Sequence, residues 1–254
     1  MIHGALGHLD VAQIVVYAFF LFFAGLVWYL RQEDRREGYP LESEAMGRLK
    51  DRGFLFIPPV KTYRLGGGKT LQTTTGLADT RPIKAAKVEP WPGAPIEPIG
   101  DPLTAGVGPG AWAERPDETD KTFDGHDLIA PLRVATNYAV TEDVGNPLGF
   151  TVLGADGKRA GSLRDLWVDR AESVVRFYEI SLDAGGYVLA PVHFADVSYS
   201  ARSVKINALL AAQIARAPQT RNPDAVTMLE EEKISAFFGA GTLYATAERQ
   251  EPLL

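Results

Sequence analysis

Cysteine is absent from this sequence of 254 residues. Its absence excludes disulfides, thiolate metal sites and cysteine nucleophiles, and it is compatible with a reducing compartment. Histidine is scarce, because only His3, His8, His126 and His193 occur and they are scattered. The sequence also contains no Gly-x-Ser-x-Gly elbow and no His-Glu-x-x-His zinc motif. We therefore expect no catalysis by this chain alone and no cofactor or metal bound by it.

Positive charge is in the minority, with 26 Lys and Arg against 32 Asp and Glu and a formal net charge of −6. A nucleic-acid-binding protein normally presents a basic face that releases counterions from phosphates. The composition therefore predicts that nucleic acid is not a partner.

Charged side chains are missing altogether from Val11 to Leu30. Twenty helical residues at about 1.5 Å each span about 30 Å, the hydrocarbon thickness of a bilayer. A buried core helix is disfavoured because all faces are apolar. A signal peptide is disfavoured because Met1 to Asp10 lacks Lys and Arg and no cleavage site follows. We expect a single transmembrane helix.

Basic residues follow this span closely and none precedes it. They are Arg31, Arg35, Arg36, Arg48, Lys50 and Arg52. This asymmetry predicts that residues 1–10 lie in the periplasm and that the bulk of the chain is cytoplasmic. The helix should continue to residue 37, with Arg36 paired to Gln32 or Glu33, and end at Gly38 and Pro40.

The run "RQEDRREGYPL" after the span resembles the H (heavy) subunit of the photosynthetic reaction centre of purple bacteria. The matching residues are Arg31, Glu33, Asp34, Arg36, Glu37, Gly38, Tyr39, Pro40 and Leu41. The resemblance recurs at "NPDAVTMLEEEKISAFFGAGTLYA", so it spans nearly the whole chain. It implies an inner-membrane, pigment-free subunit that caps the L and M membrane subunits and stabilises the secondary quinone site.

The same resemblance implies where the cofactors of the complex lie. Bacteriochlorophyll, bacteriopheophytin, quinones and non-haem iron are expected in the partner subunits. Light-harvesting antenna, a cytochrome subunit and membrane lipids are further expected neighbours.

Proline and glycine are frequent in residues 38–120, and eight of the seventeen prolines lie between Arg81 and Asp120. Such a stretch cannot hold a helix and lacks donors for a sheet, so we expect it to be extended. Its large apolar side chains, Trp91, Ile96, Ile99, Leu103 and Trp112, favour a strap on a protein surface over a disordered linker. Short strands are expected around residues 53–77.

Residues 121–254 form the expected folded domain. Apolar or alternating runs between Pro131 and Asn207 are separated by "ADGK" and "DAGG" turns, which predicts a mainly-β domain with an antiparallel sheet curled into a barrel. The region resembles a PRC-barrel, on Gly161, Asp165, Leu166, Trp167, Val168, Asp169 and Pro191. A C-terminal helix should open at Asn222-Pro223-Asp224 and stop at Gly239 or Gly241.

One dense cluster of titratable residues occurs in "FDGHD", with Asp124, His126 and Asp127. An imidazole flanked by carboxylates can collect protons from water, although such a loop is also an ordinary surface turn. The resemblance places Asp124 and His126 on a segment implicated in proton uptake, with Asp127 where relatives carry a second histidine. It adds Asp169 and Glu172 further inward, two acids whose mutual repulsion would raise their proton affinity.

Contacts with partner subunits are expected through Arg31, Glu33, Arg36, Glu37, Tyr39, Arg176 and Glu230. Arg176, on the strand after Asp169 and Glu172, could instead fix the field of those two acids. The acidic run that contains Glu230 is otherwise a solvated helix face. A rival interpretation is a membrane-tethered PRC-barrel adaptor with no role in proton transfer, whereas no motif favours a membrane-anchored enzyme. Copurification with pigmented partners separates the first two interpretations.

Overall fold

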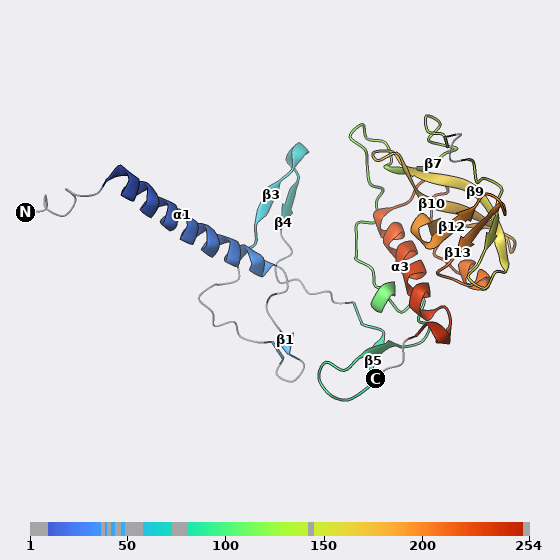
Figure 1. Ribbon diagram of the computed structural model, residues 1–254, viewed down its shortest axis with the longest axis horizontal. Helices are drawn as coiled ribbons and strands as arrows, with labels where there is room; N and C mark the ends of the chain where they lie inside the picture. Colours follow the sequence, from blue (N-terminus) through green and yellow to red (C-terminus); the bar gives the residue numbers. More distant parts are fainter. Residues whose placement is uncertain are drawn as a thin grey trace, which may run out of the picture. The chain divides into compact units, whose positions relative to one another are not determined.

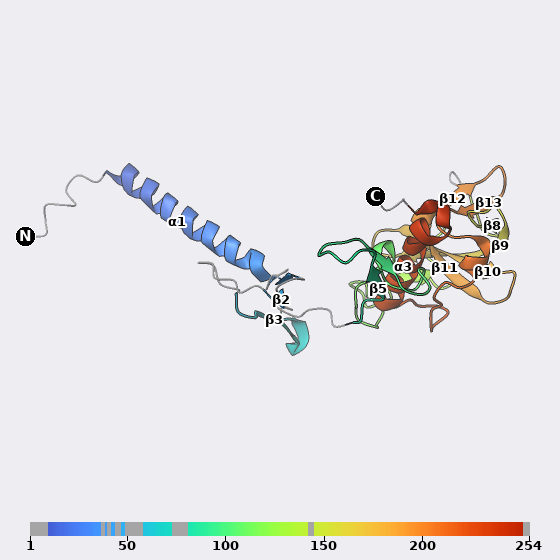
Figure 2. The same ribbon diagram turned by 90° about the horizontal axis from the view of Figure 1, so that it is seen from below.

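The computed structural model describes residues 10–36, 39, 42–43, 47–48, 58–72, 81–141 and 145–250. The chain divides into two compact units, one of residues 1–81 with 91–93 and one of residues 82–90 with 94–254 (Figures 1 and 2). The first unit contains the N-terminal helix and the second contains the large sheet.

The N-terminal helix α1 spans Val11–Glu33, and none of its residues is buried. Its apolar side chains are exposed all round, with Phe20 61% and Leu21 76% accessible. In the part of the chain that the structure describes, it is the one helix long and apolar enough to cross a membrane. A helix that is apolar on every face and unburied by its own chain is suited to a lipid environment.

A tight turn ends α1 earlier than predicted. The α-helix stops at Glu33, and a 3₁₀ turn, η1, follows at Asp34–Arg36. The predicted pairing of Arg36 is confirmed, because its Nε lies 2.6 Å from a Glu33 carboxylate oxygen. This bond at three-residue spacing suits 3₁₀ geometry, in which such positions eclipse. The predicted stop residues Gly38 and Pro40 lie outside the described residues.

Short antiparallel pairs follow in the first unit. They are β1 (Glu42–Ser43) with β2 (Gly47–Arg48), and β3 (Thr62–Arg64) with β4 (Thr70–Gln72). The second pair is joined by the 3₁₀ turn η2, Gly66–Gly68. The short strands expected in this glycine-rich stretch are therefore present at β3 and β4.

The proline-rich segment contains a sheet that was not predicted. β5 (Ala85–Lys87) pairs antiparallel with β6 (Ile96–Pro98). The prediction that donors would be too few is wrong here because β5 contains no proline, and the backbone N–H of Val88 and Ile99 also donate across the hairpin. Further on, Leu103 is buried and a 3₁₀ turn, η3, spans Gly108–Gly110.

The second unit contains a seven-stranded sheet. Its strands are β7 (Ile129–Pro131), β8 (Thr151–Leu153), β9 (Arg159–Asp169), β10 (Val174–Leu182), β11 (Tyr187–Pro191), β12 (Ala195–Ser198) and β13 (Ser203–Ile206). The path runs β11-β10-β9-β8-β13-β12, with β7 paired to β9. The predicted mainly-β fold with a C-terminal helix is confirmed.

One pair departs from the predicted antiparallel pattern, because β8 and β13 run parallel. The cause lies between β11 and β12, where the 3₁₀ turn η4 (Val192–Phe194) replaces a reversing hairpin. The pairings require β12 to continue in the direction of β11, so β13, antiparallel to β12, runs in the direction of β8.

The core lies between this sheet and the C-terminal helix α3, Met228–Tyr244, which runs along the sheet in Figure 1. Trp167, Ile180 and Leu189 from the strands are fully buried, as is Phe238 from α3. Phe237, from the same helix, is also a member of this core cluster. A short helix, α2 (Ala211–Ile214), adds Ile214 to the same cluster.

The predicted limits of the C-terminal helix are wrong at both ends. Asn222 forms a turn with Asp224, and the N-cap is Thr227 instead. The Thr227 hydroxyl accepts from the Glu230 N–H while the Glu230 carboxylate accepts from the Thr227 N–H, a capping box. The "TMLE" spacing was the sequence signal for this start.

Two glycines that were predicted to stop the helix lie inside it. A Cβ on Gly239 would stand 2.4 Å from the carbonyl oxygen of Pro109, and one on Gly241 would stand 2.5 Å from that of Ala208. Glycine is required here for close approach to other backbone segments and not for a left-handed stop.

An ionic cluster ties the segment after β7 to the sheet and to the approach to α3. Arg133 Nη1 donates to Glu179 at 2.7 Å and to Asp165 at 2.8 Å. Its Nε donates to Asp224 at 2.9 Å, and Nη2 donates to the carbonyl of Pro223. Glu179 is fully buried and also accepts from the Trp167 indole at 2.8 Å. These bonds raise the pKa of Arg133 although burial opposes them.

Replacement of Gly239 by alanine should loosen the contact between α3 and η3. The new methyl group would meet a backbone carbonyl, which cannot move aside cheaply, so we expect Gly239→Ala to lower the free energy of unfolding by about 1–3 kcal/mol. Gly66→Ala is the control, because no atom lies within 4 Å of a Cβ at that position. Thermal unfolding of the detergent-solubilised chain, followed by circular dichroism, would contradict the assignment if Gly239→Ala melted like the parent.

Candidate functional site

The titratable loop of residues 121–127 is a closed turn that ends at the start of β7. A bridge pairs Lys121 with Asp127, and Thr122 binds His126 through both its N–H and its hydroxyl. The loop holds Asp124 and His126 exposed to solvent, while Asp127 is half-buried. The three residues that the sequence singled out are therefore brought together, but in different surroundings.

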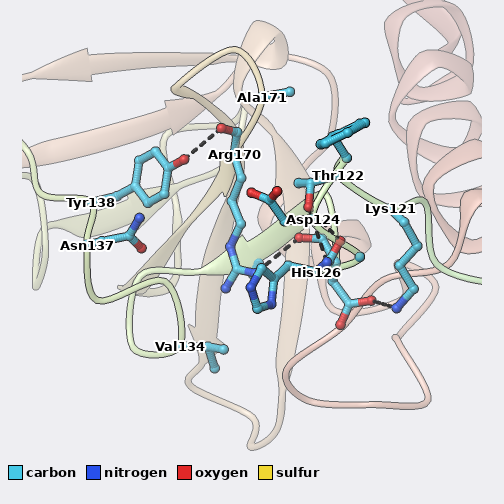
Figure 3. A pocket seen from close by; sticks show the side chains of 13 residues that line it. Lys121, Thr122, Asp124, His126, Val134, Asn137, Tyr138, Arg170 and Ala171 are labelled. Atoms are coloured by element: carbon cyan, nitrogen blue, oxygen red, sulfur yellow. Dashed lines mark hydrogen bonds and ion pairs between the residues drawn. The ribbon is translucent and has the colours of Figure 1, made fainter.

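This loop forms one wall of a groove of about 850 Å³. Figure 3 shows Asp124 and His126 on one side, Asn137 and Tyr138 on the other, and the Arg170 side chain extending between them. Tyr138 donates to the carbonyl of Arg170 at 2.6 Å, which closes the far side. The groove is open and polar, so water can reach the imidazole of His126.

Asp127 is paired with other residues of this chain. Its carboxylate lies 2.5 Å from Lys121 Nζ. Burial alone would raise the pKa of Asp127, but hydrogen bonds from Lys121 and Thr119, together with the charges of Lys121 and Arg170, hold it below its ordinary value. A carboxylate that is ionised and paired in this way anchors the loop and is less suited to carry protons than its exposed neighbours.

Asp169 lies at the end of β9 and is 3% exposed. One carboxylate oxygen accepts from the backbone N–H of Ala171 at 2.9 Å and of Glu172 at 3.1 Å. It therefore shapes the tight turn into β10, in which Ser173 takes a positive φ of 57°. The turn therefore fixes the point from which the Glu172 side chain extends.

A guanidinium group lies between the two acids that were expected to repel each other. Arg176 binds the second oxygen of Asp169 through Nε and Nη2, both at 3.2 Å, and binds Glu172 at 3.0 Å. Glu172 is exposed, with 61% of its side chain accessible. The structure thus joins Asp169, Glu172 and Arg176 into one group, with the buried acid and the exposed acid sharing a cation.

A second pocket, of about 340 Å³, lies beside this group. Its lining includes Asp169 and Arg176 from the sheet, His193 from η4 and Glu231 from the first turn of α3. His193 is exposed and Glu231 is half-buried. Sequence reasoning passed over both residues, because His193 is isolated in the sequence and Glu231 stands in an acidic run that resembled a solvated face.

The three acids of that run have three different environments. Glu230 closes the capping box and accepts from Arg221. Glu232 lies 3.8 Å from Arg115. Burial raises the pKa of Glu231 to about 7, with Asp120 and Glu232 adding to the effect and Arg115 and Arg176 opposing it. Glu231 is therefore the acid of the run that can exchange a proton near neutrality.

The expected partner contacts at the end of α1 are partly used within the chain. Arg31 lies 3.5 Å from Asp34, Glu33 is bound by Arg36 and Lys61, and the Arg35 guanidinium lies over the Tyr39 ring. Glu37 lies outside the described residues. In the second unit, Glu230 is engaged in its cap and Arg176 in its two ion pairs.

No group of three or more His, Cys, Asp or Glu side chains is placed to hold a metal ion within the described ranges. The chemistry available at the two hollows is that of imidazole, carboxylate and guanidinium groups. This set can bind, release and orient protons.

Comparison with known families gives two matches. The N-terminal region of the photosynthetic reaction centre H chain matches residues 4–134, which is more than half of the chain. The PRC-barrel domain matches residues 141–212, which contain strands β8 to β13. The two matches follow each other along the chain, and both resemblances noted in the sequence are confirmed.

Removal of the Glu231 carboxyl should change how stability depends on pH. The folded chain holds this proton up to about pH 7, and an ordinary carboxyl near 4.5 does not. The folded state therefore binds more protons in that window, and its stability falls as the pH rises through it. Because solvent reaches part of the carboxyl, we expect the free energy of unfolding to fall by about 1–2 kcal/mol as the pH rises from 4.5 to about 7. Glu231→Gln should abolish this fall.

Melting temperatures of the detergent-solubilised chain, measured in steps between these pH values, would show the difference as two curves that converge at low pH. Glu97→Gln is the matched control and should keep the slope of the parent, because Glu97 is exposed and lines neither hollow. A parental slope in Glu231→Gln would show that another group carries the effect.

Proposed function

The chain belongs to the photosynthetic reaction centre H-chain family, and from this premise we propose that it caps the L and M membrane subunits on their cytoplasmic side. Helix α1 is its single membrane anchor, with residues 1–10 in the periplasm and residues 121–254 forming the cytoplasmic domain. The basic residues that follow the span, and their absence before it, support this orientation.

The chain itself is a pigment-free, non-catalytic subunit of the complex. Light-driven electron transfer takes place in the partner subunits, which hold bacteriochlorophyll, bacteriopheophytin, quinones and non-haem iron. Residues 38–120 lie along the partners, and the exposed Trp91, Ile96 and Ile99 in this segment support such contacts. Arg31, in the last turn of α1, and Tyr39 contact neighbouring subunits or lipid headgroups of the photosynthetic membrane.

The proposal extends to proton supply for reduction of the secondary quinone to quinol. His126 and Asp124 take protons from water at the open groove, and the protons pass inward to Asp169 and Glu172. One observation carries this proposal. Arg170 and Ala171 line the groove, and in the sequence they directly join Asp169 to Glu172, so the outer groove and the two acids share one turn.

Arg176 has a positioning role in this route. It binds both inner acids, so protonation of one acid weakens one ion pair while the other pair keeps the guanidinium in place. Asp127 keeps the loop closed through Lys121. The PRC-barrel match by itself is also compatible with a tethered adaptor that assembles other complexes, and two experiments separate these functions.

Deletion of this chain should prevent accumulation of a stable pigmented complex, because the partners would lose the cap over their quinone pocket. An affinity-tagged copy restored to the same cells should copurify with proteins that absorb in the near infrared. Absorption spectroscopy of the membranes and of the purified material measures both outcomes. A colourless set of partners would favour the adaptor and remove the proposed function.

Replacement of the relay residues should slow proton uptake after the second flash. We expect Asp124→Asn with His126→Ala, and separately Asp169→Asn with Glu172→Gln, to slow uptake by about a hundredfold, the lower end of the contribution typical of a proton-transfer group. The matched control is Asp183→Asn, since Asp183 has an exposed ion pair with Arg159 and lines neither hollow. Unchanged rates from mildly acidic to mildly alkaline pH would remove these residues from the route.

A further inference from the structure

The pocket beside α3 holds an acid for which the described contacts contain no hydrogen bond and no ion pair, namely Glu231. The neighbouring acids of the same helix turn have fixed partners, Arg221 for Glu230 and Arg115 for Glu232. A half-buried carboxyl without a fixed partner is costly when ionised, and its charge state responds to its surroundings. This position therefore differs from an ordinary solvated helix face.

The two hollows of the domain share a wall. The outer groove is lined by Asp127, Ala130 and Arg170, whereas the inner pocket is lined by residues 128–129 and Asp169. Neighbouring residues of the same two segments thus face opposite hollows, and the Arg170 N–H donates to the Leu128 carbonyl across the wall. The inner pocket lies directly behind the groove that contains His126.

The inner pocket has room for water. Its volume of about 340 Å³ is several times the roughly 30 Å³ that one water molecule occupies in the liquid. Its lining supplies the polar partners that ordered water needs, including Asp120, Asp169, Arg176 and Ser235. A hydrated chamber with acids on its walls can pass protons between groups that do not touch.

We propose that the inner pocket is a proton-holding site, in which Glu231 binds the proton and the exposed His193 at its edge exchanges protons with solvent. The inference rests on the proposed function, since it assigns a reservoir to the same proton supply. The site would hold a proton close to Asp169, ready to replace each proton that the inner acids pass to the partners.

The proton balance is simple. An imidazolium at His193 gives its proton to water in the pocket, and the resulting hydronium protonates a Glu231 carboxylate oxygen, which forms one O–H bond and leaves neutral water. Release reverses the step toward Asp169. No redox change is involved, and no group other than water is needed between the two side chains.

The charged groups around Glu231 come from every element packed against it. They are Arg115 and Asp120 from the segment before β7, Asp169 and Arg176 from the sheet, His193 from η4 and Glu232 from α3. The two arginines favour the ionised acid, while the acids and the burial of the site favour the protonated form. Because these influences oppose each other, the acid is poised for exchange and not locked in one state.

Infrared titration of the purified pigmented complex tests the inference. The parent should show a carboxylic acid band that disappears with a midpoint near pH 7, and Glu231→Gln should lose it. Glu232→Gln is the matched control and should retain the band. The near-infrared spectrum of each preparation reports whether the variant complex is assembled.

A second variant keeps the test decisive if Glu231→Gln does not assemble. Arg115→Gln removes a cation that favours the ionised form, so the midpoint of the band should move to higher pH. His193→Gln should keep the band but slow its appearance after a flash. An identical titration in the parent, Glu231→Gln and Arg115→Gln would overturn the inference.

Failure of the proposed function would look different. If second-flash proton uptake were unchanged in the variants of Asp124, His126, Asp169 and Glu172, proton supply by this chain would be wrong. The band would still report whether Glu231 holds a proton.

Discussion

Glu179 lies fully buried on β10, and its charge must be neutralised inside the core of the domain. A buried carboxylate without partners would be strongly destabilising, so the fold brings Arg133 and the Trp167 indole to one oxygen. Arg164 lies 3.0 Å from the other oxygen, although it is not aligned as a hydrogen bond. The segment that follows β7 is held against the sheet by this requirement.

The same guanidinium has consequences for both hollows. Arg133 also binds Asp224 and the Pro223 carbonyl, which fixes the approach to α3 and therefore the turn that carries Glu231. Arg133 also comes directly after β7, and the loop that contains Asp124 and His126 comes directly before this strand. One ionic cluster thus sets the positions of the outer groove and of the pocket behind it, and Gly239 then lets α3 approach η3 closely.

Local features were readable from the sequence where one physical signal dominated. The uncharged run after Asp10 predicted the apolar N-terminal helix, and the alternating residues around Trp167 predicted the strands of the mainly-β domain. Signals that depend on packing were misread: Gly239 looked like a stop because its neighbour Pro109 is distant in the sequence. Asp169 and Glu172 looked like a repelling pair because the position of Arg176 between them depends on the strand pairing. Glu231 could not be separated from Glu230 and Glu232 without the capping box.

The parallel pairing of β8 with β13 bears on how the protein is made. A ribosome releases the helix α1 and the strands β7 to β12 before it releases the strand Ser203–Ile206. Until that strand emerges, β8 lacks the neighbour that joins it to β12, and the sheet stays incomplete. The nascent chain therefore already holds a helix suited to a bilayer before its sheet is complete, which keeps the unfinished sheet beside the membrane and away from other unfinished copies.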